Sequence, residues 1–111
     1  MKLMITPEAN RKLKELNVEE NKYLLLWYDR DDCGCGVNGL PTIRFTNEKK
    51  DFHQEVNNQS FPTLIPEQQA VFFNNDLKLD IHLGSFRLTS PNEMLNPFIP
   101  QHSICTPVYD N

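Results

Sequence analysis

The chain has 111 residues and a mass of 13.0 kDa, and its 11 Lys and Arg against 15 Asp and Glu give a formal net charge of −4. Binding to nucleic acid or to an anionic membrane surface needs a basic patch, so this charge argues against both partners. No apolar run approaches the roughly 18 residues of a transmembrane helix. The first residues lack the long apolar stretch of a signal peptide, so we expect a cytoplasmic protein.

The N-terminal part of the chain predicts a short strand followed by a helix. The strand covers residues 2–5. Thr6 is a favourable N-cap, and Pro7 fits the first helical turn. We therefore predict a helix to about residue 17, with one apolar stripe at i, i+4 and i+7 formed by Ala9, Leu13 and Leu16.

The middle of the chain predicts several strands. Residues 23–28 form a continuous apolar run that is short enough for a buried strand, and residues 41–46 alternate between apolar and polar side chains. Weaker strand patterns cover residues 52–56 and 61–65. We assign the aromatic side chains of this region to the core, namely Trp27, Tyr28, Phe45, Phe72 and Phe73.

The clearest hairpin pattern has arms at residues 70–73 and 77–83 around a turn at 74–76. Its second arm alternates, which predicts that Leu77, Leu79, Ile81 and Leu83 point inward. A further strand at residues 86–89 follows a turn at Gly84. One helix followed by many short strands predicts a small α+β domain that is mainly β and mainly antiparallel.

The tail, residues 93–111, has a different composition. Pro97, Pro100 and Pro107 exclude long regular elements, yet the tail is too apolar to be freely solvated. We expect it to pack on the core or on a second subunit. Because there is no repeat, linker or low-complexity tract, the whole chain from 1 to 111 is predicted to be one domain.

Cys33 and Cys35 carry the strongest chemical signal in the sequence. On a regular strand they would point to opposite faces, but Gly34 and Gly36 permit a bend that aims both sulfurs at one metal. Thiolates suit iron–sulfur clusters, zinc and copper(I). Such sites take about four ligands, so the pair needs help from Cys105, a histidine, a second subunit or an external thiol.

Other interpretations of this pair stay open. The flanking Asp29, Asp31 and Asp32 disfavour a low-pKa catalytic thiolate but do not oppose a metal cation. A reversible disulfide between Cys33 and Cys35 would close a small, strained ring. A purely structural role, as small buried residues in a glycine-rich turn, is the third possibility.

Cys105 is the remaining candidate ligand and follows His102 by three residues; its alternative is a half-buried cysteine of the tail. His53 and His82 lie in strand-like segments and are expected at the surface. The sequence has no nucleotide-binding glycine motif, nucleophile elbow or zinc-protease motif, so we predict no catalytic residues.

Three segments in the correct order resemble HesB/IscA-type proteins, the A-type carriers of iron–sulfur cluster assembly. Residues 5–16, with ITPEA and LKEL, resemble the opening of that family, and residues 34–36 resemble its first Gly-Cys-x-Gly loop. Residues 84–92 (GSFRLTSPN) resemble the Gly-Phe-x-Phe-x-Asn-Pro-Asn segment before its terminal cysteines. The resemblance covers residues 1–92 and implies a HesB-like pseudo-barrel with a compact mixed β-sheet as the core.

The same resemblance implies a function in iron–sulfur cluster biosynthesis. The chain would bind iron or an Fe–S cluster transiently through Cys33 and Cys35, with Cys105 from the same or a partner chain, while Gly34 and Gly36 shape the loop. It would pass this cargo to apo-proteins, work with Fe–S assembly proteins or as a homodimer, and perform no enzymatic reaction.

One departure from the family favours a different outcome. Cluster-carrying members have a Cys-Gly-Cys pair shortly after the Asn-Pro-Asn segment, where this chain has residues 93–97 (EMLNP). The alternative is therefore a HesB-like binding or regulatory module that has lost the cluster and whose tail fills the vacated space. A thiol-redox protein that uses Cys33 and Cys35 is the third hypothesis.

Overall fold

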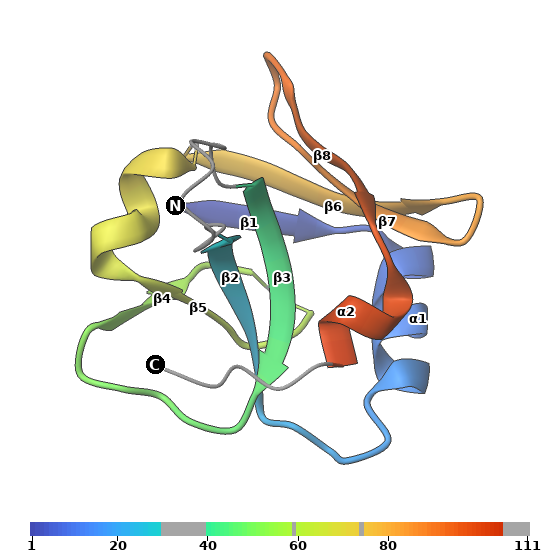
Figure 1. Cartoon of the computed structure of the whole chain (residues 1–111), viewed down its shortest axis with the longest axis horizontal. Helices are drawn as coiled ribbons and strands as arrows, with labels where there is room; N and C mark the ends of the chain where they lie inside the picture. The colour runs from blue at the N-terminus through green and yellow to red at the C-terminus, as the bar shows by residue number, and fades with distance from the viewer. Residues whose placement is uncertain (30–39, 59, 74, 106–111) are drawn as a thin grey trace, which may run out of the picture.

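Two four-stranded sheets, one main helix and shorter helical turns make up the part of the chain that the computed structural model describes, which is residues 1–29, 40–58, 60–73 and 75–105. One sheet has the order β1-β6-β7-β8, from β1 (Lys2–Ile5), β6 (Asp76–His82), β7 (Ser85–Thr89) and β8 (Met94–Ile99). The other has the order β3-β2-β5-β4, from β2 (Tyr23–Asp29), β3 (Leu40–Thr46), β4 (His53–Val56) and β5 (Thr63–Pro66). In Figure 1, β1 and β6 run across β2 and β3.

Both sheets are mixed. β1 pairs with β6 in parallel and β2 pairs with β5 in parallel, whereas the other strand pairs within the two sheets are antiparallel. The predicted α+β fold, mainly β with a mixed sheet, is therefore confirmed.

Helix α1 (Pro7–Leu16) follows β1 as predicted. The Thr6 side chain accepts a hydrogen bond from the Ala9 N–H at 3.2 Å, which caps the first turn. The Asn17 N–H donates to the Leu13 carbonyl and closes the last turn. Ala9 and Leu13 are fully buried, so the predicted stripe is the face that packs on the sheets.

One hydrophobic core joins both sheets and both α-helices. It includes Leu26 of β2, Leu79 of β6 and Phe86 of β7, all fully buried. The short helix α2 (Gln101–Cys105) contributes Ile104, which is also fully buried. Through these contacts α2 packs against β3, the outer strand of the second sheet.

The predicted hairpin over residues 70–83 is wrong in its first arm. Residues Glu67–Phe72 form a 3₁₀ helix, η1, and β6 pairs instead with β7. The turn between these strands is Leu83–Gly84, both with positive φ, as a tight two-residue hairpin turn requires. Leu83, predicted to point inward, is 91% exposed because the strand's alternation ends one residue earlier.

The tail forms a strand despite Pro97. β8 is an edge strand, Pro97 is exposed, and the β7–β8 register shifts on either side of Leu88. An edge position tolerates proline, because the missing N–H has no ladder partner to satisfy. The sequence pattern alone favoured an irregular segment here.

Candidate functional site

The segment that carries Cys33 and Cys35 connects β2 to β3. Cys33, Gly34, Cys35 and Gly36 lie outside the described residues, but the two ends of their segment are fixed. Asp29 and Leu40 are direct partners in the antiparallel β2–β3 register. The ten residues 30–39 therefore start and finish side by side at one end of this strand pair.

Beside this end, the two sheets are joined by a buried hydrogen bond. The Asn96 side chain of β8 is only 3% exposed, and its Nδ2 donates to the Pro41 carbonyl of β3 at 2.6 Å. Its Oδ1 accepts the Phe98 N–H at 3.0 Å, so both ends of the amide are used. Asn96 thus ties β8 to the strand that leads directly out of the cysteine-bearing segment.

This junction also contains the stretch where the resemblance expects the terminal Cys-Gly-Cys pair. Residues 93–97 hold no cysteine, and all but Glu93 belong to the paired strand β8. The stretch 93–97 thus lies close to Leu40, where the segment 30–39 ends, and of these two parts of the chain only residues 30–39 contain thiols.

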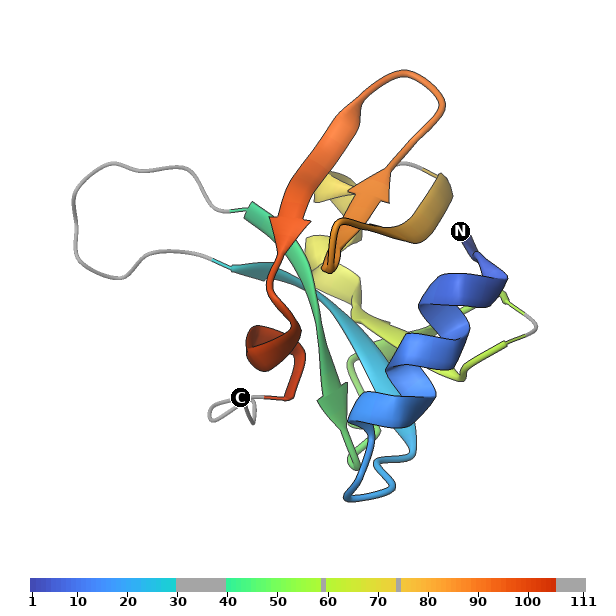
Figure 2. The same ribbon diagram turned by 90° about the vertical axis from the view of Figure 1, so that its right-hand side faces the viewer.

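Cys105 lies at the other end of the β2–β3 strand pair. Its Sγ is 3.8 Å from the Leu16 carbonyl oxygen at the end of α1, and it lines a cavity together with Thr46, the last residue of β3. Seven residue pairs separate the two ends of the strands, a distance of about 20 Å. Figure 2 shows β3 starting beside β8 and ending near the end of α1.

The thiol of Cys105 is free and exposed. His102, three residues earlier on α2, is exposed too. In the described ranges no group of three or more His, Cys, Asp and Glu side chains is arranged to hold a metal ion. The spacing of His102 and Cys105 therefore does not build a metal centre on α2 by itself.

We name the cavity that Cys105 lines the aromatic cavity. Its volume is about 640 Å³, within the range of about 300–1,000 Å³ that is typical of ligand sites. It lies over β2 and the β3–β4 connection. Its walls are Glu19, Asn21, Leu25, Trp27, Phe45, Thr46, Asn47, Glu48, Lys50, Phe52, His53, Pro66, Gln68, Gln69 and Cys105.

His53 is a hydrogen-bonded, neutral side chain in the wall of this cavity. Its Nδ1 accepts the Lys50 backbone N–H at 3.0 Å, and its ring packs edge-on against Phe52. Partial burial, aided by the positive charge of Lys50, lowers the pKa of His53 below its ordinary value of 6.5. With Nδ1 accepting, the neutral ring carries its proton on Nε2 and can donate there.

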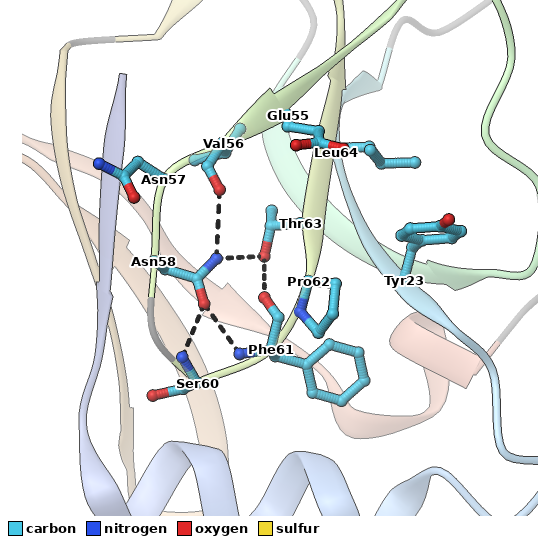
Figure 3. Close-up of a pocket in the computed structure, with 10 residues that line it drawn as sticks. All are labelled: Tyr23, Glu55, Val56, Asn57, Asn58, Ser60, Phe61, Pro62, Thr63 and Leu64. Atoms are coloured by element: carbon cyan, nitrogen blue, oxygen red, sulfur yellow. Dashed lines mark hydrogen bonds between the residues drawn. The ribbon is translucent and has the colours of Figure 1, made fainter.

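A second cavity, of about 510 Å³, lies at the β4–β5 turn (Figure 3). The Asn58 side chain in its wall bonds to other residues of the turn. Asn58 Oδ1 accepts the N–H groups of Ser60 and Phe61 at 2.9 and 2.8 Å, and its Nδ2 donates to Thr63 Oγ1 at 2.8 Å. This network fixes the turn, and we assign it a structural role.

The chain matches the sequence profile of the family described as iron–sulphur cluster biosynthesis over residues 1–100. The chain belongs to this family. It is 31% identical over 100 residues to the uncharacterized protein YqkB of Bacillus subtilis (strain 168), an alignment that covers 87% of this chain and 94% of YqkB. The predicted HesB/IscA-type resemblance is therefore confirmed.

Solved structures of similar fold agree with the family assignment. A Lactobacillus salivarius protein assigned to Fe–S biosynthesis superposes with a TM-score of 0.66 at 21% identity, covering 90% of this chain and 95% of the other. IscA with its [2Fe–2S] cluster superposes with a TM-score of 0.61 at 18% identity, covering 87% and 98%. At these identities the likeness establishes a shared fold.

Two features of the site in this member of the iron–sulphur cluster biosynthesis family were not predicted from the sequence. The aromatic cavity was not foreseen, because Trp27 was assigned to the core and is in fact half-buried in the cavity wall. The Asn96–Pro41 bond depends on where β8 meets β3, which no local pattern reveals.

Within the described residues, no helix is long and apolar enough to cross a membrane.

Proposed function

We propose that this protein is a cytoplasmic carrier in iron–sulfur cluster biosynthesis that holds iron or a cluster transiently at Cys33 and Cys35 and passes it to apo-proteins. The observation that carries this proposal is the family match over residues 1–100, which includes the segment with both cysteines. Holding and passing a cluster requires no reaction on an organic substrate, so we assign no enzymatic activity.

Thiol chemistry supports Cys33 and Cys35 as the ligands. Soft thiolates are the preferred ligands of Fe–S clusters, and glycine at positions 34 and 36 permits backbone conformations in which both sulfurs face one cargo. Acidic neighbours raise the cost of a free thiolate, and an incoming iron cation offsets that cost.

Two thiolates leave a cluster under-ligated, so the remaining ligands come from outside the subunit. A [2Fe–2S] cluster usually takes four thiolates. Two copies of the chain supply that number from two Cys33–Cys35 pairs. Cys105, the third ligand predicted from the sequence, is about 20 Å from the anchors of this segment along β2–β3, which disfavours its sharing a site within one subunit.

The test is anaerobic reconstitution with ferrous iron and sulfide. Wild type is compared with Cys33→Ser/Cys35→Ser by iron and sulfide content, visible absorption and size-exclusion elution. We expect bound iron and sulfide in the wild type, an elution shift towards a dimer on loading, and transfer to an apo-ferredoxin; the double variant should lose all three. Equal iron and sulfide in the double variant would refute the assignment.

A second candidate function is a binding or regulatory module that kept the fold without the cargo. The observation in its favour is β8: the stretch expected to carry the terminal cysteines is a paired strand whose Asn96 is buried and fully hydrogen-bonded. This candidate predicts a wild type that stays colourless and free of iron after reconstitution.

A further inference from the structure

The aromatic cavity presents aromatic side chains to a group that enters it. Trp27 and Phe52 are both wall residues; Trp27 is half-buried and Phe52 is 43% exposed. The faces of such rings carry partial negative charge, so they attract cations as well as apolar groups. A ligand of this cavity is therefore selected by its charge as well as by its apolar surface.

One cation of the chain already lies beside an aromatic ring of this wall. The Lys50 Nζ is 6.0 Å from the centroid of the Phe52 ring, a distance at which a cation and an aromatic ring still attract each other. The backbone of Lys50 is held in place, because its N–H donates to His53 Nδ1 at 3.0 Å. The wall thus accommodates positive charge near an aromatic ring.

The charges in the wall also favour a cationic ligand. Its charged residues, among those that the structure describes, are Glu19, Glu48 and Lys50, so the carboxylates outnumber the ammonium group. His53 adds no positive charge at neutral pH, because partial burial lowers its pKa below the ordinary value of 6.5. The whole chain has a formal net charge of −4, which favours the approach of cations.

Arginine is the cationic side chain that matches these groups best. Its planar guanidinium stacks on aromatic rings, and its five N–H donors need acceptors. Glu19 and Glu48 are exposed and offer carboxylate oxygens, and the exposed Gln68 offers a neutral amide oxygen. At about 640 Å³ the cavity has the volume of a site for a drug-sized ligand, which leaves room for the residues on either side of an arginine.

We propose that the aromatic cavity receives an arginine side chain from a segment of a partner protein. The guanidinium lies against Trp27, and the carboxylates of Glu19 and Glu48 balance its charge. This inference does not depend on cargo binding at Cys33 and Cys35. It assigns the second sheet a partner site of its own.

Trp27 gives a direct readout, because it is the one tryptophan in the sequence. The full chain is titrated with the peptide acetyl-GGRGG-amide, and binding is followed by tryptophan emission and by the NMR signal of the indole N–H. The control peptide carries citrulline, which has the shape of arginine without its charge. We expect a saturable change with the arginine peptide that weakens as salt is added, and binding of the citrulline peptide that is about three- to thirtyfold weaker.

Two variants with opposite expected effects test the sign of the charge that is recognised. Glu48→Gln removes an attractive carboxylate and should weaken binding of the arginine peptide by up to about fivefold. Lys50→Gln removes a repulsive ammonium group and should strengthen it by a similar factor. Glu93→Gln makes the same charge change as Glu48→Gln at an exposed position in the other sheet's β7–β8 connection, and should leave binding unchanged. Circular dichroism and the unfolding midpoint establish that each variant is folded.

Three results would overturn the proposal. One is an unchanged Trp27 signal at saturating concentrations of the arginine peptide. Another is equal binding of the arginine and citrulline peptides, which would mean that charge is not recognised. The third is a reversal of the two variants, with Lys50→Gln weakening and Glu48→Gln strengthening the binding.

Discussion

The two ends of the β2–β3 strand pair differ in what they offer. At the Asp29–Leu40 end, the chain carries two cysteines and three glycines in residues 30–39, next to the junction where Asn96 of β8 bonds Pro41 of β3. At the Tyr23–Thr46 end, it carries one exposed cysteine, Cys105, beside a cavity with aromatic walls. The first end is the one at which we propose metal binding, and the second has a cavity with a partly apolar wall.

This difference bears on how the three cysteines are grouped. A count of cysteines suggests one site with three ligands, whereas the anchors of the segment with Cys33 and Cys35 lie about 20 Å along the strands from the end that Cys105 adjoins. If the two ends act separately, as we propose, substitutions at one end should leave the properties of the other unchanged.

The largest effect is expected at the Cys105 end, from Ile104→Ala. This side chain is fully buried and attaches α2 to the core, so its truncation should lower the free energy of unfolding by about 2–5 kcal/mol. Chemical denaturation measures the loss. Val71→Ala, at an 81% exposed position, is the control and should change the stability by less than about 0.5 kcal/mol.

If α2 is the anchor that we describe, Ile104→Ala should also alter Trp27 emission while iron binding at Cys33 and Cys35 stays at the wild-type level. A stable Ile104→Ala protein, within about 0.5 kcal/mol of the wild type, would contradict the placement of α2 in the core.

A smaller loss is expected at the other end, from Asn96→Ala. This change removes the donor to the Pro41 carbonyl and leaves a buried acceptor unpaired, at a cost of about 1–3 kcal/mol. The exposed Asn92 provides the matched control, Asn92→Ala. Equal unfolding midpoints for the two variants would show that the β3–β8 junction is not held by this bond.

The smallest expected effect is the contribution of His53 to the pH dependence of the free energy of unfolding. Its pKa is lowered in the folded state, so the unfolded chain binds the proton more readily. The stabilisation from neutral His53 is therefore complete when the pH is above the ordinary histidine pKa of 6.5. It is lost as the pH falls below that value and through the lower pKa of the folded state. His53→Gln should flatten the fall of the unfolding midpoint on acidification.

An NMR titration gives the same answer without unfolding. A His53 pKa at or above 6.5 in the native protein would contradict the burial and the Lys50 hydrogen bond that we describe for the wall of the aromatic cavity.

The sequence was most informative where the decisive interactions are local. The N-cap of Thr6, the stripe of Ala9 and Leu13 and the alternation at Ile43 and Phe45 predicted elements that the structure contains, because each depends on residues within a few positions of one another. The family motifs added the mixed-sheet architecture that such patterns cannot provide.

Prediction from the sequence failed where tertiary packing decides between similar local patterns. The apolar residues 70–73 suited a strand as well as the end of a 3₁₀ helix, and the exposed Val71 shows which was formed. Pro97 argued against a strand that an edge position tolerates. The position of Cys105 relative to the ends of β2 and β3 follows from α2 packing against β3, a contact between residues about 60 positions apart.

The measurement that tests the central claim most directly is the iron and sulfide content of three proteins reconstituted side by side: wild type, Cys33→Ser/Cys35→Ser and Cys105→Ser. Our account predicts that Cys105→Ser retains both iron and sulfide at the wild-type level and that the double variant retains neither. Loss in Cys105→Ser with retention in the double variant would place the cargo at the wrong end of the β2–β3 strand pair and contradict the account.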